Sequence, residues 1–154
     1  MAELASVDPA IISLLAPPNP CAICPPGTFW ITGTDRCKIC PEGTFAGQGS
    51  CECTKCKFGT ASKKGAASCG QCPPGQYQDN EGQSKCIDCA VGSYAGTPGT
   101  KTCEPCPCGS VAPKPRAVKC KECPKGKDQQ KPGMTECNEC IAGTYADVPG
   151  RCHC

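Results

Sequence analysis

Leucine is missing from most of this chain. All three leucines (Leu4, Leu14 and Leu15) lie in the first fifteen residues, and none occurs from Cys21 to Cys154. Aromatic residues make up only 5% of the 154 residues. Burying a leucine or isoleucine side chain stabilises a fold by roughly 1.5–3 kcal/mol. A chain that has so few of these side chains cannot be held together by an ordinary apolar core.

The groups that most enzymes need are also missing. The only histidine, His153, stands between two cysteines, and no Ser/His/Asp set, paired-carboxylate site or phosphate-binding glycine loop appears. We therefore expect a protein that is not an enzyme, with no catalytic residue, no cofactor and no bound metal. The lysines lack interleaved aromatic residues, which argues against nucleic acid as a partner.

No apolar stretch is long enough to span a bilayer, so we expect the chain not to cross a membrane itself. The start, Met1-Ala2-Glu3-Leu4, lacks a basic region, and we interpret it as the start of a processed chain whose targeting segment is not present. No Asn-x-Ser/Thr sequon occurs, which favours a lumen reached without glycosylation, such as a plastid (thylakoid) or bacterial one.

Cysteine is what the chain has in abundance. The chain has 20 cysteines, a share far above the one that indicates a disulfide scaffold. It also has 18 glycines and 17 prolines. Disulfides persist in oxidising compartments. The composition predicts a protein of the extracellular space or an organelle lumen, stabilised by cross-links instead of apolar packing.

The cysteines form a regular repeat. Pairs of the form C-x-x-C define eight repeats, numbered from the first cysteine of each pair: Cys21, Cys37, Cys53, Cys69, Cys86, Cys103, Cys120 and Cys137. The steps are 16 residues three times and then 17, and one more step of 17 reaches Cys154. A glycine follows the second cysteine by three residues in every repeat: Gly27, Gly43, Gly59, Gly75, Gly92, Gly109, Gly126 and Gly143.

Each repeat is expected to form one small irregular hairpin. The repeat glycine supplies a positive φ in a turn, and an aromatic residue two positions later begins a short extended segment in five repeats: Phe29, Phe45, Tyr77, Tyr94 and Tyr145. The third, sixth and seventh repeats depart from this pattern with Ala61, Val111 and Asp128. The fold class we predict is small and disulfide-rich: residues 21–154 form an elongated tandem array of irregular β-hairpins with little helix.

The segments Cys21-Ala-Ile-Cys24-Pro-Pro-Gly-Thr-Phe29 and Cys37-Lys-Ile-Cys40-Pro-Glu-Gly-Thr-Phe45 share the motif C-x-x-C-P-x-G-T-[F/Y]. This motif resembles the cysteine-rich repeats of ephrin-receptor-like ectodomains. It is similar, more distantly, to tumour-necrosis-factor-receptor and EGF-like repeats. The resemblance covers residues 21–154 and implies an extracellular scaffold that binds other proteins.

Two disulfide pairings stay open, because spacing alone does not fix connectivity. The first closes each hairpin, from Cys24–Cys37 onward to Cys140–Cys154, and leaves Cys21, Cys51, Cys108 and Cys152 over. The second, EGF-like pairing is Cys24–Cys40, Cys37–Cys51, Cys53–Cys69, Cys56–Cys72, Cys86–Cys103, Cys89–Cys106, Cys108–Cys120, Cys123–Cys140 and Cys137–Cys152. We favour the second because it leaves only Cys21 and Cys154, whether free, paired together or intermolecular.

Zinc is a third use for the same cysteines. Cys21, Cys24, Cys37 and Cys40 have a spacing that a tetrahedral four-thiolate site could use, and the repeats could supply four such sites. The spacing runs unbroken through all eight repeats, however, whereas zinc modules usually alternate short knuckles with longer inserts. We therefore rank a zinc array below a disulfide array.

Residues 1–20 form a tail of different composition. Asp8 and Pro9 suit the start of a helix, which could continue through Ala10–Leu15 until Pro17-Pro18 end it. We expect its apolar side chains to dock into a partner: Ile11, Ile12, Leu14 and Leu15.

Positive charge is concentrated near the other end. From Val111 to Lys131, which we call the basic segment, seven bases stand against Glu122 and Asp128: Lys114, Arg116, Lys119, Lys121, Lys125, Lys127 and Lys131. A solvated surface is the simpler interpretation of such a segment. A functional one is salt-sensitive docking on an acidic protein face through Lys114, Arg116, Lys119 and Lys121.

Two functions from different classes follow. In the first, the chain is a structural accessory subunit, docked by its tail on the oxidising face of a larger, membrane-bound assembly. In the second, it is a ligand-binding ectodomain fragment of a receptor or matrix protein. In both, its partners are other proteins.

Overall fold

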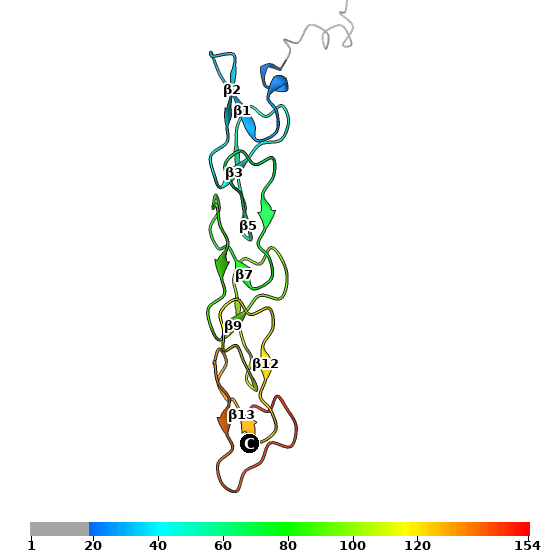
Figure 1. Ribbon diagram of the computed structural model, residues 1–154, viewed down its shortest axis with the longest axis vertical. Coiled ribbons are helices and arrows are strands. Elements are labelled where there is room, and N and C mark those ends of the chain that lie inside the picture. The colour runs from blue at the N-terminus through cyan, green and yellow to red at the C-terminus, as the bar shows by residue number, and fades with distance from the viewer. Residues whose placement is uncertain (1–18) are drawn as a thin grey trace, which may run out of the picture.

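The computed structural model describes residues 19–154, so the predicted helix and its docking residues Ile11, Ile12, Leu14 and Leu15 lie outside the described residues. The described chain is a narrow rod along which successive hairpins follow one another from β1 at one end to β13 at the other (Figure 1). The predicted fold class is confirmed: short two-stranded hairpins in tandem, with one four-residue 3-10 turn, Pro20–Ile23, in the described part.

Seven antiparallel two-stranded sheets account for all the strands of residues 19–154. In chain order the strands are β1 Thr28–Ile31, β2 Arg36–Ile39, β3 Thr44–Phe45, β4 Thr54–Lys55, β5 Thr60–Ala61, β6 Gly70–Gln71, β7 Gln76–Tyr77, β8 Ile87–Asp88, β9 Ser93–Tyr94, β10 Glu104–Pro105, β11 Ser110–Val111, β12 Lys121–Glu122, β13 Lys127–Asp128 and β14 Asn138–Glu139. Each strand pairs with its neighbour in this order, β1 with β2 through β13 with β14. Only the first hairpin has strands of four residues.

Backbone hydrogen bonds join each repeat to the next. Between the second and third repeats, the Gly43 N–H donates to the Ser62 carbonyl at 2.8 Å, and the Gly43 carbonyl accepts from the Cys56 N–H at 2.9 Å. The Gly65 N–H donates to the Cys40 carbonyl at 2.9 Å. The equivalent three bonds occur at every junction of the eight repeats. Two-residue strands are marginal alone, so this ladder makes the hairpins one continuous structure.

The three repeats without an aromatic residue keep the same ladder. Ala61, Val111 and Asp128 each follow a repeat glycine whose N–H and C=O make the bonds described above. Asp128 is 5% exposed, and its carboxylate accepts hydrogen bonds from the Cys154 N–H at 3.2 Å and the Gln130 Nε2 at 3.3 Å. Stacking therefore depends on the backbone and the cysteines more than on the aromatic ring.

The threonine of the P-x-G-T motif, or a serine in its place, closes the turn after the second cysteine in six of the eight repeats. The Thr44 N–H and its Oγ1 both donate to the Pro41 carbonyl, at 3.3 and 2.7 Å. The same hydroxyl bond to the residue three positions earlier is made by Thr28, Thr60, Ser93, Ser110 and Thr144. A hydroxyl that bonds a nearby carbonyl favours turns, which gives this motif position a physical role.

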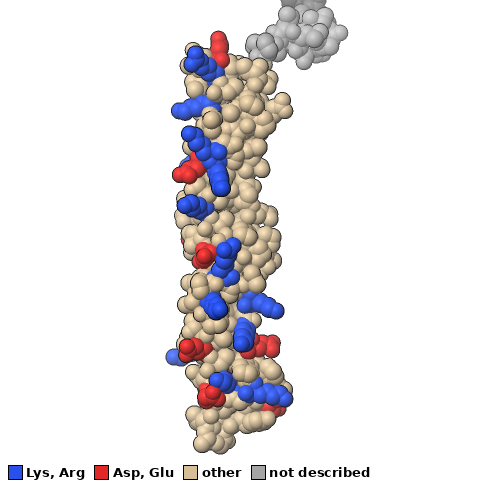
Figure 2. Space-filling view, in the orientation of Figure 1, with Lys and Arg blue, Asp and Glu red and all other residues tan. Residues whose placement is uncertain are grey.

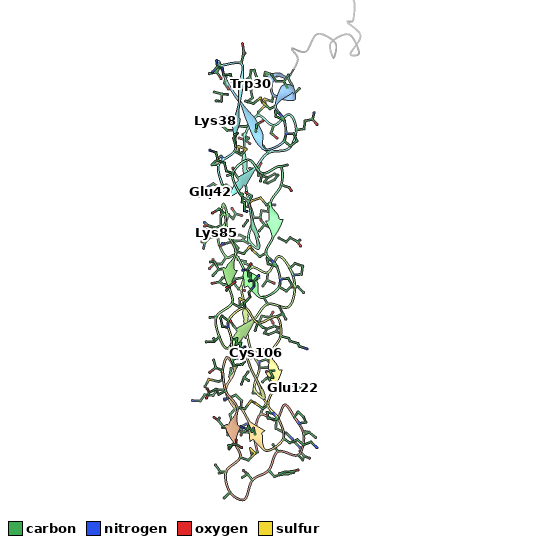
Figure 3. All side chains as sticks on the ribbon, in the orientation of Figure 1. Trp30, Lys38, Glu42, Lys85, Cys106 and Glu122 are labelled. Carbon is green, nitrogen blue, oxygen red and sulfur yellow. A yellow bond between two sulfur atoms is a disulfide. The ribbon has the colours of Figure 1, made fainter. Side chains whose placement is uncertain are left out.

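Sulfur takes the place of an apolar interior. The second cysteine of seven repeats is 0% exposed: Cys24, Cys40, Cys56, Cys72, Cys89, Cys106 and Cys123. Figure 3 shows that the side chains of Lys38, Glu42 and Lys85 lie at the edge of the rod instead. The buried apolar side chains other than cysteine are Val111 and four alanines: Ala46, Ala95, Ala112 and Ala146.

The disulfide pairing corrects our preferred scheme. The second cysteine of each pair joins the first cysteine of the next, and we call these bonds rungs: Cys24–Cys37, Cys40–Cys53, Cys56–Cys69, Cys72–Cys86, Cys89–Cys103, Cys106–Cys120, Cys123–Cys137 and Cys140–Cys154. The EGF-like pairing was wrong, as was the expectation that Cys21 and Cys154 are left over.

The four cysteines that the hairpin scheme left over pair with one another. Cys21 joins Cys51 and Cys108 joins Cys152, across 30 and 44 residues. We call these two bonds clamps, because each ties together repeats that the rungs already connect. No free cysteine remains among residues 19–154. We chose the EGF-like pairing because it left fewer cysteines unpaired. That criterion failed, since only the stacking of the hairpins brings these distant cysteines together.

Candidate interaction surface

The described residues carry open surface hollows. One of them, of about 770 Å³, is lined by residues of the basic segment and by Pro149: Lys119, Cys120, Lys121, Glu122, Pro124 and Pro149. The four-thiolate zinc sites considered above do not form, because each of their cysteines is held in a disulfide and has no thiolate to give.

Two acid–base groups have pKa values displaced by a specific neighbour. A hydrogen bond from the Tyr94 hydroxyl to Glu104, at 3.0 Å, raises the pKa of the tyrosine. The Arg151 guanidinium, which donates to Asp147 at 2.6 Å, lowers the pKa of that carboxyl group. Both pairs are exposed on the surface, where such contacts contribute little to stability.

The basic segment lies in the sixth and seventh repeats, from the end of β11 across β12 to the residues after β13. Lys127 bonds Glu139 at 2.6 Å, and Arg116 lies 3.9 Å from Asp88. The other five bases are exposed and form no ion pair within residues 19–154: Lys114, Lys119, Lys121, Lys125 and Lys131. Figure 2 shows basic side chains along most of the rod, with acidic ones interspersed among them from the N-terminal end to the C-terminal third.

Arg116 occupies a backbone position that glycine fills in other repeats. Its φ is +62°, and its N–H donates to the Cys89 carbonyl at 2.8 Å. The equivalent ladder donors at the other junctions are all glycines: Gly49, Gly65, Gly82, Gly99, Gly133 and Gly150. A left-handed conformation costs an L residue roughly 1–2 kcal/mol. The chain therefore carries an exposed arginine at a strained position, and such outliers cluster at functional sites.

Replacing Arg116 by glycine is expected to leave the rod folded and to raise its resistance to unfolding. Glycine removes about 1–2 kcal/mol of backbone strain, and the exposed ion pair with Asp88 that is lost is worth about 0–1 kcal/mol. Guanidinium unfolding with the disulfides intact measures the difference. As a control, Lys114→Gly removes a base from the same loop without relieving strain, so a gain in both variants would contradict this explanation.

Two exposed apolar residues, which the sequence did not single out, occupy the position before the repeat glycine. Phe58 is 43% exposed and Val91 49% exposed, in the third and fifth repeats. The Lys101 ammonium lies 4.0 Å from the centroid of the Phe58 ring, a cation–π contact that joins these two repeats. Its only sequence signal is an apolar residue where other repeats have Pro26, Glu42 or Lys125.

The two sets of docking residues predicted from the sequence differ in whether the structure describes them. Lys114, Arg116, Lys119 and Lys121 lie exposed within two adjacent repeats. Ile11, Ile12, Leu14 and Leu15 lie outside the described residues, so their docking role stays a prediction. Within residues 19–154, no helix has the length and apolar character needed to cross a bilayer.

Comparison with known proteins bears on one part of the rod. No curated protein matches the chain. Residues 59–102, however, match the family described as tyrosine-protein kinase ephrin type A/B receptor-like. The match confirms the resemblance to this family for residues 59–102, and the family is a receptor and interaction module, not a catalytic one. With the disulfides, it points to an oxidising extracellular or lumenal environment. Residues 59–102 are an ephrin-receptor-like cysteine-rich segment within a rod of similar hairpins.

Proposed function

We propose that this chain is a non-enzymatic interaction rod, docked as an accessory subunit on the oxidising face of a larger, membrane-bound assembly. The basic segment makes the electrostatic contact with an acidic protein face. Residues 1–20 insert their apolar side chains Ile11, Ile12, Leu14 and Leu15 into the same assembly. The rod spans neighbouring subunits and holds them at a fixed spacing.

Arg116 is the observation that carries this proposal. The other repeat junctions use glycine where the sixth repeat has this arginine. Glycine adopts this backbone conformation without strain and would serve the stacking of the repeats better than Arg116 does. Stacking therefore does not explain the arginine. Five lysines that form no ion pair within residues 19–154 lie in the same two repeats, so a contact with an acidic partner would compensate the strain.

A second candidate is the ligand-binding ectodomain fragment, which the ephrin-receptor-like match of residues 59–102 favours. In this function the partner is a soluble protein ligand, and the matched hairpins from β5 to β9 form the contact. Size-exclusion chromatography of the native source separates the two functions. Co-migration with a large membrane-derived complex supports the accessory subunit, whereas a free monomer contradicts it and favours the ectodomain.

Reversing the charge of Lys119 and Lys121 together, each to glutamate, is expected to weaken co-migration by tenfold or more, because like charges then face an acidic partner. The matched control is the same change at Lys63 and Lys64, two exposed lysines of the third repeat. Both variants are compared at low and high salt, where screening reduces the wild-type association. Equal loss in both variants, or association that ignores salt, would contradict docking through the basic segment.

Deleting residues 1–16 tests the other contact. The rod of residues 19–154 is expected to keep its ladder and all ten disulfides, since no rung or clamp involves those residues. Association with the assembly should fall. An unchanged co-migration of the shortened chain would show that the tail does not dock.

A further inference from the structure

We infer that the Cys108–Cys152 clamp is a site of thiol–disulfide exchange, which a dithiol protein in the same oxidising compartment can open and close. The inference goes beyond docking and does not depend on it. It rests on the exposure of this disulfide, on the groups around it and on its place among the other nine.

Exposure distinguishes this clamp from the rungs. Cys108 and Cys51 are the two exposed cysteines of the described chain, whereas the others are buried or half-buried. Cys51 bonds Cys21, which is 1% exposed, while Cys108 bonds Cys152, which is half-buried. Exchange requires that a thiolate reach a disulfide sulfur. Cys108–Cys152 is therefore the one disulfide of residues 19–154 that joins an exposed cysteine to a half-buried one.

A basic side chain lines the same surface hollow as the accessible cysteine. Cys108 and Lys119 line one open surface hollow of about 330 Å³, together with Tyr94, Ser110 and Glu122. A nearby ammonium group attracts an incoming thiolate and stabilises the cysteine thiolate that reduction leaves behind. The buried rung cysteine Cys106, only two residues from Cys108, is 0% exposed. Its rung partner Cys120 is half-buried and lines the same hollow, so this rung is shielded at Cys106 and reachable only at Cys120.

The exchange proceeds in two balanced steps. The thiolate of the incoming dithiol attacks the Cys108 sulfur, the Cys108–Cys152 bond breaks, and Cys152 leaves as a thiolate that takes up a proton. The second cysteine thiolate of the reductant then attacks the reductant sulfur that is bonded to Cys108. This forms the disulfide of the reductant and releases the Cys108 thiolate, which is also protonated. The net result is two cysteine thiols in this chain and one disulfide in the reductant.

Opening the clamp changes one end of the rod and leaves the rest joined. The bond ties the sixth repeat to the eighth across 44 residues, whereas the rungs Cys106–Cys120, Cys123–Cys137 and Cys140–Cys154 still connect these repeats in sequence. The Gly150 N–H, which donates to the Cys123 carbonyl at 2.9 Å, and the Gln129 N–H, which donates to Arg151 at 3.4 Å, lie in the section that the clamp holds. Reduction loosens these bonds beside the basic segment.

Limited reduction of the folded full chain with dithiothreitol, followed by alkylation and peptide mass mapping, tests the site. Cys108 and Cys152 should be the first cysteines labelled, at least tenfold faster than Cys106 and Cys120. First labelling at Cys21–Cys51 or at Cys140–Cys154, or simultaneous labelling of all ten disulfides, would overturn the inference.

Two matched variants test the part played by Lys119. Lys119→Gln should slow reduction of the clamp about threefold, the effect of one charge at close range in water. Lys121→Gln removes a base that does not line this hollow and should leave the rate unchanged. Equal rates in both variants and the wild type would refute a role for Lys119.

Hydrogen exchange of the singly reduced chain tests the structural consequence. The amides of Gly150 and Gln129 should exchange about tenfold faster than in the oxidised chain. The amides of Gly65 and Gly82, which make the equivalent ladder bonds in the third and fourth repeats, serve as internal controls and should not change. No acceleration at Gly150 and Gln129 would show that the clamp has no conformational effect and would overturn its role as a switch.

Discussion

Replacing Gly59 by alanine is expected to destabilise the rod by about 2–5 kcal/mol. A Cβ atom at this position would lie 2.0 Å from the carbonyl oxygen of Gly99, two repeats further along the chain. The added methyl group overpacks a backbone contact, which costs about 1–3 kcal/mol. Alanine must also adopt a φ of +72°, which adds roughly 1–2 kcal/mol.

Gly126→Ala is the matched control for this variant. Its φ of +78° imposes the same backbone strain, but a Cβ atom there would meet nothing within 4 Å. This variant should lose only about 1–2 kcal/mol. Guanidinium unfolding with intact disulfides measures both variants, and hydrogen exchange of the Gly99 amide, which donates to the Cys72 carbonyl at 2.8 Å, reports the local effect. Equal losses in the two variants would mean that close approach between alternate repeats contributes nothing.

Complete reduction is expected to unfold residues 19–154 without added denaturant. The largest fully buried side chains of the rod are cysteines, and alanine supplies much of the remaining buried apolar surface. A disulfide that closes a loop of about 15 residues contributes roughly 3 kcal/mol in the chain-entropy model, and the rungs span 13 or 14 residues. Small-angle scattering should change from a rigid rod to a random chain, and amide protection should disappear.

The thiol count provides the control for the reduction experiment. The native chain should react with no equivalents of an alkylating reagent and the reduced chain with 20, one for each cysteine. A native chain that reacts with 20 equivalents and keeps its shape would contradict disulfide stabilisation. A reduced chain that stays rod-shaped would show that the backbone ladder is sufficient alone.

Much of the fold could be predicted because residues close together in the sequence specify each repeat. The spacing of the C-x-x-C pairs fixes where each hairpin begins, and glycine and threonine at fixed offsets specify one turn. The rungs connect cysteines 13 or 14 residues apart, so one of our two pairing schemes contained all eight. The choice between the schemes was wrong, since it was made by counting leftover cysteines.

The clamps could not be derived from the same pattern. Cys21–Cys51 and Cys108–Cys152 join residues 30 and 44 positions apart, and their closeness depends on how the hairpins stack. The strain at Arg116 had no sequence signal of its own either. In the sequence, Arg116 is only one more base in a basic segment. The backbone hydrogen bonds show that it stands where the other junctions have a glycine with a positive φ.

The amino-acid sequence by itself determined that this chain is a cross-linked array of hairpins, because a chain without leucine after Cys21 has no other source of stability and a period of 16 or 17 residues allows one hairpin per repeat. Tertiary structure decided which distant cysteines pair near the two ends of the rod, why an added side chain at Gly59 would collide with Gly99, and which basic residues lie exposed. The physical reason is distance along the chain: local turns follow from neighbouring residues, whereas contacts between alternate repeats exist only after the hairpins have stacked.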